Sequence, residues 1–352
     1  MSDTTHKTVL TLDAGGTNFV FSAIRDFEEV VTPVRLDAVT DNAVRCLETL
    51  VQGFREVEAL LDEPPVAISF AFPGPADYEA GIIGDLPNFP CFRGGVAMGP
   101  YLSHAFGLPV FINNDGNLFA YGEAIAGLLP RMNRALEQAG STRRYHNLIG
   151  LTLGTGFGAG VVLDGKLLKG DNGCGGDVWL MRNVHNPSLY AEESVSIRAV
   201  KRVYREASGD ARDLSPKDIC AIADGRADGD RAAALLSFRD LGVAAADALA
   251  HALDIADGLV VVGGGVSGAA HHILPALVEA VNPWLQMEVL DLTTEAGMRA
   301  FLEDDSTLVP VPGTDETVRY RQGKKTGIAV STLGTSRAVS LGAYAFALAE
   351  LG

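Results

Sequence analysis

The sequence is poor in cysteine and has no two cysteines at the spacing of a zinc or redox motif. Its four cysteines, Cys46, Cys91, Cys174 and Cys220, are scattered along 352 residues. We therefore expect reduced thiols in a cytoplasmic protein, with neither a disulfide framework nor a zinc site built from CxxC pairs. The N-terminal segment MSDTTHKTV lacks the pattern of a secretory signal, which agrees with that location.

Positive charge is also scarce. The chain has 28 lysines and arginines against 44 aspartates and glutamates, which gives a formal net charge of −16. Nucleic acids and anionic membranes bind through clusters of basic residues, so we expect neither as a partner. A phosphorylated ligand remains compatible with this charge, because backbone amides and a metal ion can offset it locally.

Long hydrophobic runs without glycine are missing as well. The longest uncharged stretch, NLIGLTLGTGFGAGVVL (147–163), contains five glycines and two threonines. This composition does not suit a helix that spans a membrane. The stretch predicts a strand, a turn and a second strand, and we expect no membrane segment.

Glycine, in contrast, is abundant, with 40 residues, and it gathers at the bends of two similar hairpins. They are TVLTLDAGGTNFVFSAI (8–24, bend at Gly15, Gly16 and Thr17) and NLIGLTLGTGFGAGVVLDGKLLKG (147–170, bend at Thr155 and Gly156). Bare glycines let backbone amides approach phosphate oxygens closely, because no Cβ intervenes. Two such bends predict two related halves that hold the phosphates of a nucleotide from both sides.

One alternative for the second hairpin is the dinucleotide-binding fingerprint of a dehydrogenase. GTGFGA (154–159) matches GxGxxA, but that fingerprint requires a helix directly after its glycines. The residues that follow are β-branched and lead into a tight turn, which predicts a strand. The sequence therefore disfavours a nicotinamide-dependent dehydrogenase.

A third glycine cluster follows the apolar strand LVVV and precedes a helical pattern. It consists of Gly263, Gly264 and Gly265. On its own it fits an ordinary turn between a strand and a helix. Beside the other two clusters, it also fits a flat surface against which a purine and its ribose lie.

Five motifs stand in the order and at the separations of one known family. They are LDAGGTN (12–18), PNFP (87–90), INNDGNLFAYGE (112–123), LTLGTGFGAG (151–160) and VVVGGGVSG (260–268). Through them the chain resembles the ROK family of sugar kinases, a branch of the actin-like ATPase superfold. The resemblance implies an α/β protein with two domains of this ribonuclease H-like fold and with the active site in the interdomain cleft.

The resemblance also gives the expected division of the chain. We expect an N-terminal α/β domain over residues 1–120, completed by a C-terminal helix at about 335–352. A larger C-terminal α/β domain would cover 121–334. Residues 286–326 look like an insertion in it, a surface excursion with turns that could equally belong to a subunit interface, and a homodimer is compatible with the sequence.

The function implied by the resemblance is transfer of the γ-phosphoryl group of ATP to a hexose hydroxyl, with Mg²⁺ as the cofactor. The expected acceptor is the 6-hydroxyl of glucose, which gives glucose 6-phosphate. An N-acetylhexosamine, mannose or fructose kinase and a non-catalytic sugar-binding homologue remain alternatives. Family regulators carry a DNA-binding segment before the sugar domain; because the first hairpin begins at residue 8, we expect none here.

Asp115 is the candidate catalytic base. It follows the strand PVFI, at the end where open α/β sheets hold ligands. From its spacing alone, Asp115 fits the N-cap of the next helix as well as it fits a base. The resemblance assigns it as the base that accepts the proton of the sugar hydroxyl.

The nucleotide-binding residues come from the three glycine clusters. By resemblance, Asp13 would hold Mg²⁺, through water. The residues expected at ATP are Asp13, Gly15, Gly16, Thr17, Thr155, Gly156, Gly263, Gly264 and Gly265. Together they place phosphate contacts on both halves of the molecule.

The sugar-binding residues are carried over from the family where the motifs match. They are Asn88, Asn114, Asp115, Asp177 and Glu192, with Glu193 as an equal candidate beside Glu192. In GCGGDVWLMRN (173–183), Leu180 stands where the family has a histidine. The cysteine-rich zinc loop of the family is missing, and we therefore expect no structural zinc.

Overall fold

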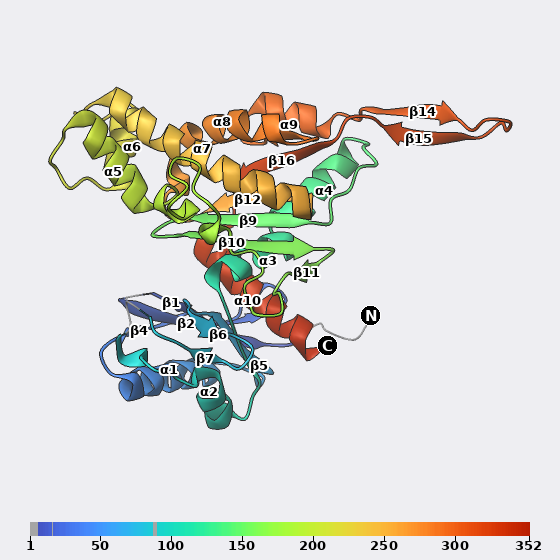
Figure 1. The fold of residues 1–352 in the computed structure, drawn as a ribbon. Helices are drawn as coiled ribbons and strands as arrows, with labels where there is room; N and C mark the ends of the chain where they lie inside the picture. The colour runs from blue at the N-terminus through green and yellow to red at the C-terminus, as the bar shows by residue number, and fades with distance from the viewer. Residues whose placement is uncertain (1–5, 16, 87–89) are drawn as a thin grey trace.

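The computed structural model describes residues 6–15, 17–86 and 90–352. Figure 1 shows two α/β lobes, one formed by the N-terminal part of the chain and one by the later part. Two of the expected site residues, Gly16 and Asn88, lie outside the described residues.

The N-terminal lobe is built on a sheet with the strand order β3-β2-β1-β5-β8, and β4 pairs with β2. The strands are β1 (Val9–Ala14), β2 (Asn18–Arg25), β3 (Glu28–Glu29), β4 (Val34–Asp37), β5 (Ala67–Ala71) and β8 (Val110–Asn113). β1 and β2 form the antiparallel hairpin, and β5 and β8 continue the sheet in parallel. Helices α1 (Ala43–Glu58) and α2 (Met98–Phe106) accompany it, together with the short strands β6 (Ala76–Asp77) and β7 (Ile82–Ile83).

An aromatic core joins α1 to this sheet. The rings of Phe21 and Phe54 meet edge to face with centroids 5.0 Å apart. Gly53 makes this contact close, because a Cβ there would collide with the Phe21 ring. Edge-to-face pairs are favourable beyond the area that they bury, so the β1–β2 hairpin stands on a rigid base.

The second lobe repeats the pattern with the strand order β11-β10-β9-β12-β16-β13. The strands are β9 (Leu148–Leu153), β10 (Phe157–Leu163), β11 (Lys166–Leu167), β12 (Leu259–Gly263), β13 (Glu288–Asp291) and β16 (Lys325–Val330). β9 and β10 are an antiparallel hairpin, and β12, β16 and β13 continue in parallel. Both sheets therefore consist of an antiparallel hairpin continued by parallel strands, and the second adds the parallel edge strand β13. This shared arrangement agrees with the two related halves that the similar hairpins predict.

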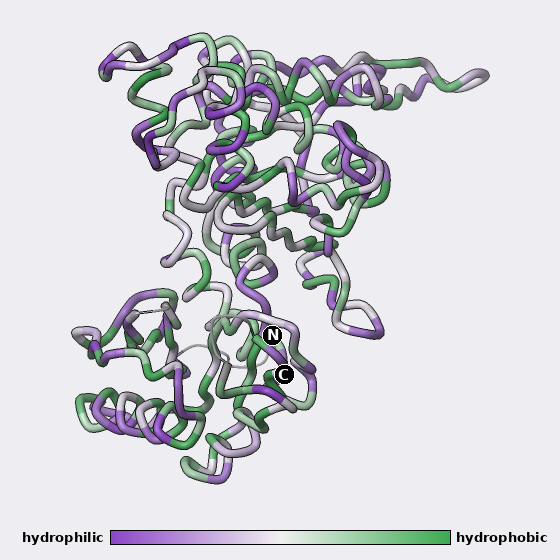
Figure 2. Tube along the Cα trace, turned by 60° about the vertical axis from the view of Figure 1, so that its left-hand side comes forward, coloured by the Kyte–Doolittle hydropathy of each residue, from purple (hydrophilic) through white to green (hydrophobic). Residues whose placement is uncertain are grey.

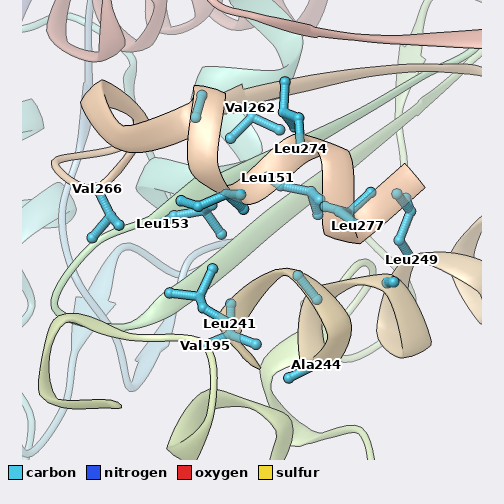
Figure 3. Close-up of a cluster of buried hydrophobic side chains, with 14 of the residues drawn as sticks. Leu151, Leu153, Val195, Leu241, Ala244, Leu249, Val262, Val266, Leu274 and Leu277 are labelled. Carbon is cyan, nitrogen blue, oxygen red and sulfur yellow. The ribbon is translucent and has the colours of Figure 1, made fainter. Parts of the chain in front are cut away.

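Helices cover the second sheet and form its core. They include α4 (Leu128–Gln138), α5 (Ile197–Ser208), α6 (Pro216–Ala223), α7 (Arg231–Ala256), α8 (Ala270–Val281) and α9 (Glu295–Leu302). Figure 3 shows Leu151 and Val262 of the sheet facing Leu241 of α7 and Leu274 of α8. Each of these side chains is at most 1% exposed, so α7 and α8 are fixed firmly on β9 and β12.

Two helices lie between the sheets, α3 (Asp115–Ile125) and α10 (Thr335–Leu351) (Figure 1). Their backbones touch at two glycines. A Cβ on Gly122 would collide with the carbonyl of Ala338, and one on Gly342 with the carbonyl of Leu118. α10 also contacts β1 and β5, so the C-terminal helix packs on the first sheet.

The segment 286–326 contains both sheet and projecting structure. Its first part supplies the edge strand β13, which pairs with β16, and helix α9. Only β14 (Ser306–Pro310) and β15 (Thr317–Arg321) form a hairpin that projects from the lobe (Figure 1). The segment is thus built into the second sheet at both of its ends.

Figure 2 shows hydrophobic and hydrophilic residues intermixed along the chain in both lobes. Within the described residues, no helix combines the length and the apolar character that a bilayer span requires.

Candidate functional site

The first hairpin bend lies between β1 and β2. The amide of Gly15 donates to the carbonyl of Asn18 at 3.0 Å and closes the bend. A Cβ on Gly15 would lie 2.9 Å from the same oxygen, so the close turn requires glycine there. Asp13 and Thr17 are exposed on either side, and Asp13 lines a cavity of about 290 Å³ beside Arg337 of α10.

The second hairpin bend is stabilised by hydrogen bonds and an ion pair of a glutamate. The carboxylate of Glu192 accepts a hydrogen bond from the amide of Phe157 at 3.0 Å and pairs with Arg198 at 3.0 Å. Arg198 in turn donates to the carbonyl of Thr155 at 3.3 Å. A Cβ on Gly156 would lie 2.5 Å from Glu192 Oε2. Glu192 therefore holds the bend in place, while Thr155 at its tip is exposed.

Glu193, the neighbouring candidate, has a different environment. It pairs with Arg198 at 2.6 Å, and its backbone carbonyl accepts from Arg202. The pairing with Arg198 lowers the pKa of the Glu193 carboxyl. Both glutamates are thus engaged with the arginines of α5 at the second bend.

The third glycine cluster is packed against the second bend. Gly264 has a φ of +90°, and a Cβ there would collide with the backbone of Leu153. The amide of Val266 donates to the Leu153 carbonyl at 2.9 Å. A Cβ on Gly263 would meet the ring of Phe119, whereas one on Gly265 would meet nothing within 4 Å. Two of the three glycines are therefore required by packing, and Gly265 presents open space.

Asp115 is the first residue of α3, and Asn114 is the N-cap. The Asn114 side chain accepts from the amide of Gly116 at 2.8 Å, and Asp115 Oδ1 accepts from the same amide at 2.9 Å. Asp115 is exposed to solvent, but protein surrounds it on most sides. This partial desolvation raises the pKa of the Asp115 carboxyl, and the hydrogen bond from Gly116 offsets the rise only in part.

Glycines press the start of α3 against strand β10. A Cβ on Gly116 would lie 2.7 Å from the carbonyl oxygen of Ala159. A Cβ on Gly160 would lie 2.6 Å from the Gly116 oxygen and 2.7 Å from the Cα of Asn117. Because backbone meets backbone here, Asp115 is fixed beside the strand that leads away from the second bend.

Tyr78, which the sequence analysis did not predict as a site residue, interacts with several of the predicted polar residues. Its hydroxyl donates to the carbonyl of Phe72 at 2.9 Å. Burial and the negative charges of Asp115 and Asp177 raise the pKa of the phenol, and a hydrogen bond with the Asn114 side chain opposes this. Asn114 is thus hydrogen-bonded to this phenol, and the charges of Asp115 and Asp177 act on it electrostatically. A lone tyrosine between turn residues carries no pattern that would have identified it.

Asp177 directly follows a turn at a glycine. Gly176 has a φ of +87°, and a Cβ there would be 3.5 Å from the Cα of Gly160. Burial raises the pKa of the Asp177 carboxyl, although Trp179 and Cys174 donate hydrogen bonds to it. Leu180, in the position of the family's histidine, is 47% exposed.

A cavity of about 600 Å³ adjoins the group, lined by Tyr78, Asn113, Asn117 and the loop 169–173. Asn117 donates to Asn113 Oδ1 at 3.0 Å. The other end of its amide, Oδ1, is buried and has no hydrogen-bond partner among the described residues. A buried acceptor without a partner is costly, and this oxygen is shielded within the cavity wall.

Comparison with known proteins identifies a family and several similar proteins. The model of the ROK family matches residues 9–308. The crystal structure of a glucokinase from Parabacteroides distasonis superposes with a TM-score of 0.92, at 56% identity over 99% of both chains. A glucokinase from Thermotoga maritima is 29% identical over 78% of this chain and 87% of its own length.

A relative with another substrate in its name matches a shorter region. The N-acetyl-D-glucosamine kinase of Vibrio cholerae serotype O1 is 30% identical over 170 residues. This region covers 48% of this chain and 51% of the relative.

Proposed function

The chain belongs to the ROK family, and on that premise we propose that it is an ATP-dependent sugar kinase that phosphorylates the 6-hydroxyl of glucose. The observation that carries the proposal is the position of Asp115. Glycine contacts hold it beside the second hairpin, and the charges of Asp115 and Asp177 both act on the phenol of Tyr78. The similarity to two proteins named glucokinase, over 99% and 78% of this chain, supports glucose as the acceptor.

Phosphoryl transfer requires mainly positioning and charge neutralisation, since the protein forms few covalent bonds in it. The two hairpin bends would supply these through Gly15 and Thr17 on one side and Thr155 and Gly156 on the other. Gly265 offers open space for the adenosine part. Asp13 is an exposed carboxylate at the first bend, which is the oxygen ligand that Mg²⁺ prefers. Bound there through water, the ion would neutralise charge on the phosphates.

Asp115 would act as the general base. As the sugar oxygen bonds to the γ-phosphorus, the bond from that phosphorus to the bridging oxygen breaks, and ADP leaves. The hydroxyl proton passes to the carboxylate of Asp115. A raised pKa suits this role, because a base works best when its pKa approaches the working pH.

The sugar would be held by the polar group around Tyr78. Each buried sugar hydroxyl needs a partner. Asn114 would supply a donor and an acceptor, and the carboxylate of Asp177 would supply acceptors. Glu192 is expected at the sugar by resemblance. Its contacts with Phe157 and Arg198 also support a role in shaping the second bend.

An N-acetylhexosamine kinase is the second candidate, and one observation favours it. Asp177 is one methylene shorter than the family's glutamate, and Leu180 replaces a histidine. Together these changes would make the sugar pocket wider and less polar. The similarity to an N-acetyl-D-glucosamine kinase over half of the chain supports the same alternative. Mannose and fructose kinases and a non-catalytic sugar-binding homologue are the remaining alternatives.

The test is ADP release from Mg-ATP with glucose, N-acetylglucosamine, N-acetylmannosamine, mannose and fructose, each over a range of concentrations. We expect the highest kcat/KM with glucose. A higher value with an N-acetylated sugar would replace glucose as the assigned acceptor. A flat panel from a folded protein that binds ATP would contradict the kinase activity itself.

A further inference from the structure

Four side chains of metal-binding type meet at the outer side of the second lobe. Cys220 lies near the end of α6, and Asp224 is the C-cap of that helix. His271 and His272 lie in the first turn of α8. One ligand atom from each residue lies within 4.8 Å of all the others. We call these four residues the α6–α8 cluster.

The carboxylate of Asp224 is at the centre of the cluster. Its Oδ1 lies 2.9 Å from Nε2 of His271 and 2.7 Å from Nε2 of His272. Its Oδ2 lies 3.8 Å from the sulfur of Cys220. The two imidazole rings are adjacent, with centroids 4.0 Å apart. Both rings therefore direct the same nitrogen toward one point.

The cluster is buried on one side and open on the other. Cys220 is 8% exposed, and the ring of His272 stacks on Phe238 with centroids 5.9 Å apart. The side chain of His271 is 56% exposed. An ion could thus enter past His271 and be held against a rigid inner wall.

We propose that the α6–α8 cluster binds one Zn²⁺ ion or a chemically similar divalent transition-metal ion. Imidazole and thiolate ligands select such metals, whereas Mg²⁺ and Ca²⁺ prefer oxygen ligands. With zinc, ligand atoms stand about 2.0–2.3 Å from the metal. Atoms already within 4.8 Å of one another reach those distances by small rotations of the side chains.

The charges and protons balance at this site. A thiolate, a carboxylate and two neutral imidazoles carry a charge of −2, which a divalent ion neutralises. Binding forms the metal–sulfur bond and releases the thiol proton of Cys220 to solvent, so affinity rises with pH. Arg226, which pairs with Asp224 Oδ2, would then support the coordinating carboxylate from outside.

The presence of Cys220 favours a metal site over a network that only forms hydrogen bonds. Asp224 has partners in Arg226 and the two histidines, and a thiol adds little to such a network because it is a weak donor. As a thiolate it is instead a strong ligand for zinc. The expectation of no zinc rests on the missing cysteine-rich loop, whereas these residues lie elsewhere in the chain.

A bound ion would join two helices that are far apart in the sequence. α8 follows directly on η4 (Ser267–Ala269) and the glycine turn, and α6 also contacts η4. Because binding would require the folded arrangement, the ion should raise the melting temperature. The site lies outside the residues proposed for the kinase reaction, so its test is independent of that activity.

The first experiment titrates the chelator-treated full chain with Co²⁺, without nucleotide, and records its absorption. We expect saturation at about one ion per chain with a thiolate-to-cobalt charge-transfer band. Zn²⁺ should displace the cobalt, abolish the band and raise the melting temperature. A wild-type protein that takes up no ion in this ratio, or binds without the thiolate band, would overturn the proposal.

Variants then assign the ligands. Cys220→Ser should remove the band, and His271→Ala should weaken binding by more than the roughly 10- to 100-fold that loss of a supporting residue costs. Because His271 is largely exposed, its loss should leave the fold intact. Matched controls are Cys174→Ser and His251→Ala, both at exposed positions. Wild-type spectra from Cys220→Ser, or loss of the band in Cys174→Ser, would refute the assignment.

Discussion

The two glycine hairpins have similar sequences but different surroundings. The β1–β2 bend is closed by its own hydrogen bond from Gly15 to Asn18. The β9–β10 bend is held by Glu192 and Arg198 on one side and by the turn at Gly264 on another. The start of α3 also packs against β10. We infer that the second hairpin and Asp115 form one rigid unit. In the proposed kinase, the first bend would hold its part of the nucleotide against this unit.

The largest effect is expected where that unit would meet the substrate. Asp115→Asn keeps the size of the side chain but removes the base, so kcat should fall by about 10²–10⁴. Stability should change little, since Asn114 caps the helix. Initial rates of ADP release and a melting curve measure both. Unchanged kcat would exclude Asp115 as the base.

The next largest effect is expected from a substitution that separates Asp115 from the second hairpin. In Gly160→Ala, the new Cβ would strike the backbone of Gly116, which costs about 1–3 kcal/mol of stability. Displacement of Asp115 by about 1 Å would lower kcat by about 10². Urea unfolding and steady-state kinetics measure the two effects.

The matched control is Gly154→Ala in the same hairpin, where a Cβ would meet nothing within 4 Å. Its stability should equal that of the wild type. If both variants unfold at the same urea concentration, the close packing of α3 on β10 is not what fixes Asp115.

The support of the second bend can be tested with adjacent glutamates. Glu192→Ala leaves the amide of Phe157 without its acceptor and should cost about 1–3 kcal/mol. Glu193→Ala breaks only a surface pair and should cost less than about 1 kcal/mol. The KM for ATP should rise with Glu192→Ala alone. Equal effects of the two changes on stability and KM would refute a special role for Glu192.

A smaller effect is expected from the two exposed threonines. Thr17→Ala and Thr155→Ala each remove one hydroxyl from a bend. At about 0.5–1.5 kcal/mol per hydrogen bond, the KM for ATP should rise roughly 2- to 12-fold in each, with stability unchanged. The KM is measured by varying ATP at saturating sugar. If only one of the two substitutions raises it, the two bends do not both contact the phosphates.

The smallest expected effect is a shift in the pH dependence of activity, caused by the environment of Asp115. Only the deprotonated carboxylate can accept the proton, and desolvation raises its pKa in the folded protein. Activity should therefore decline on acidification at a higher pH than an ordinary aspartate would give. The acid limb of kcat/KM against pH measures this, and circular dichroism checks that the chain stays folded. An acid limb at or below the ordinary pKa of an aspartate would contradict the expected shift.

Much of the fold followed from local patterns in the sequence. Glycine and threonine between β-branched runs indicated both hairpins, and their repetition predicted two related halves. The position of Asp115 after a buried strand was also readable. In each case, neighbours in the sequence determine the conformation, so a single chain carries the information.

Contacts between distant segments could not be read in this way. Asn114, and not Asp115, caps α3, a choice that depends on backbone geometry. The charge of Asp177 acts on Tyr78 although about a hundred residues separate them in the sequence, and Gly264 is needed because Leu153 lies against it. The α6–α8 cluster likewise exists only because packing brings two helices together. Such pairs have no common spacing that would reveal them.

The most direct test of the central claim is product analysis by ³¹P NMR with ATP, Mg²⁺ and glucose. The account predicts that wild-type protein forms glucose 6-phosphate and ADP in equal amounts, and that Asp115→Asn forms almost none. Release of inorganic phosphate from ATP without any sugar phosphate would contradict it, as would equal sugar phosphate formation by the variant.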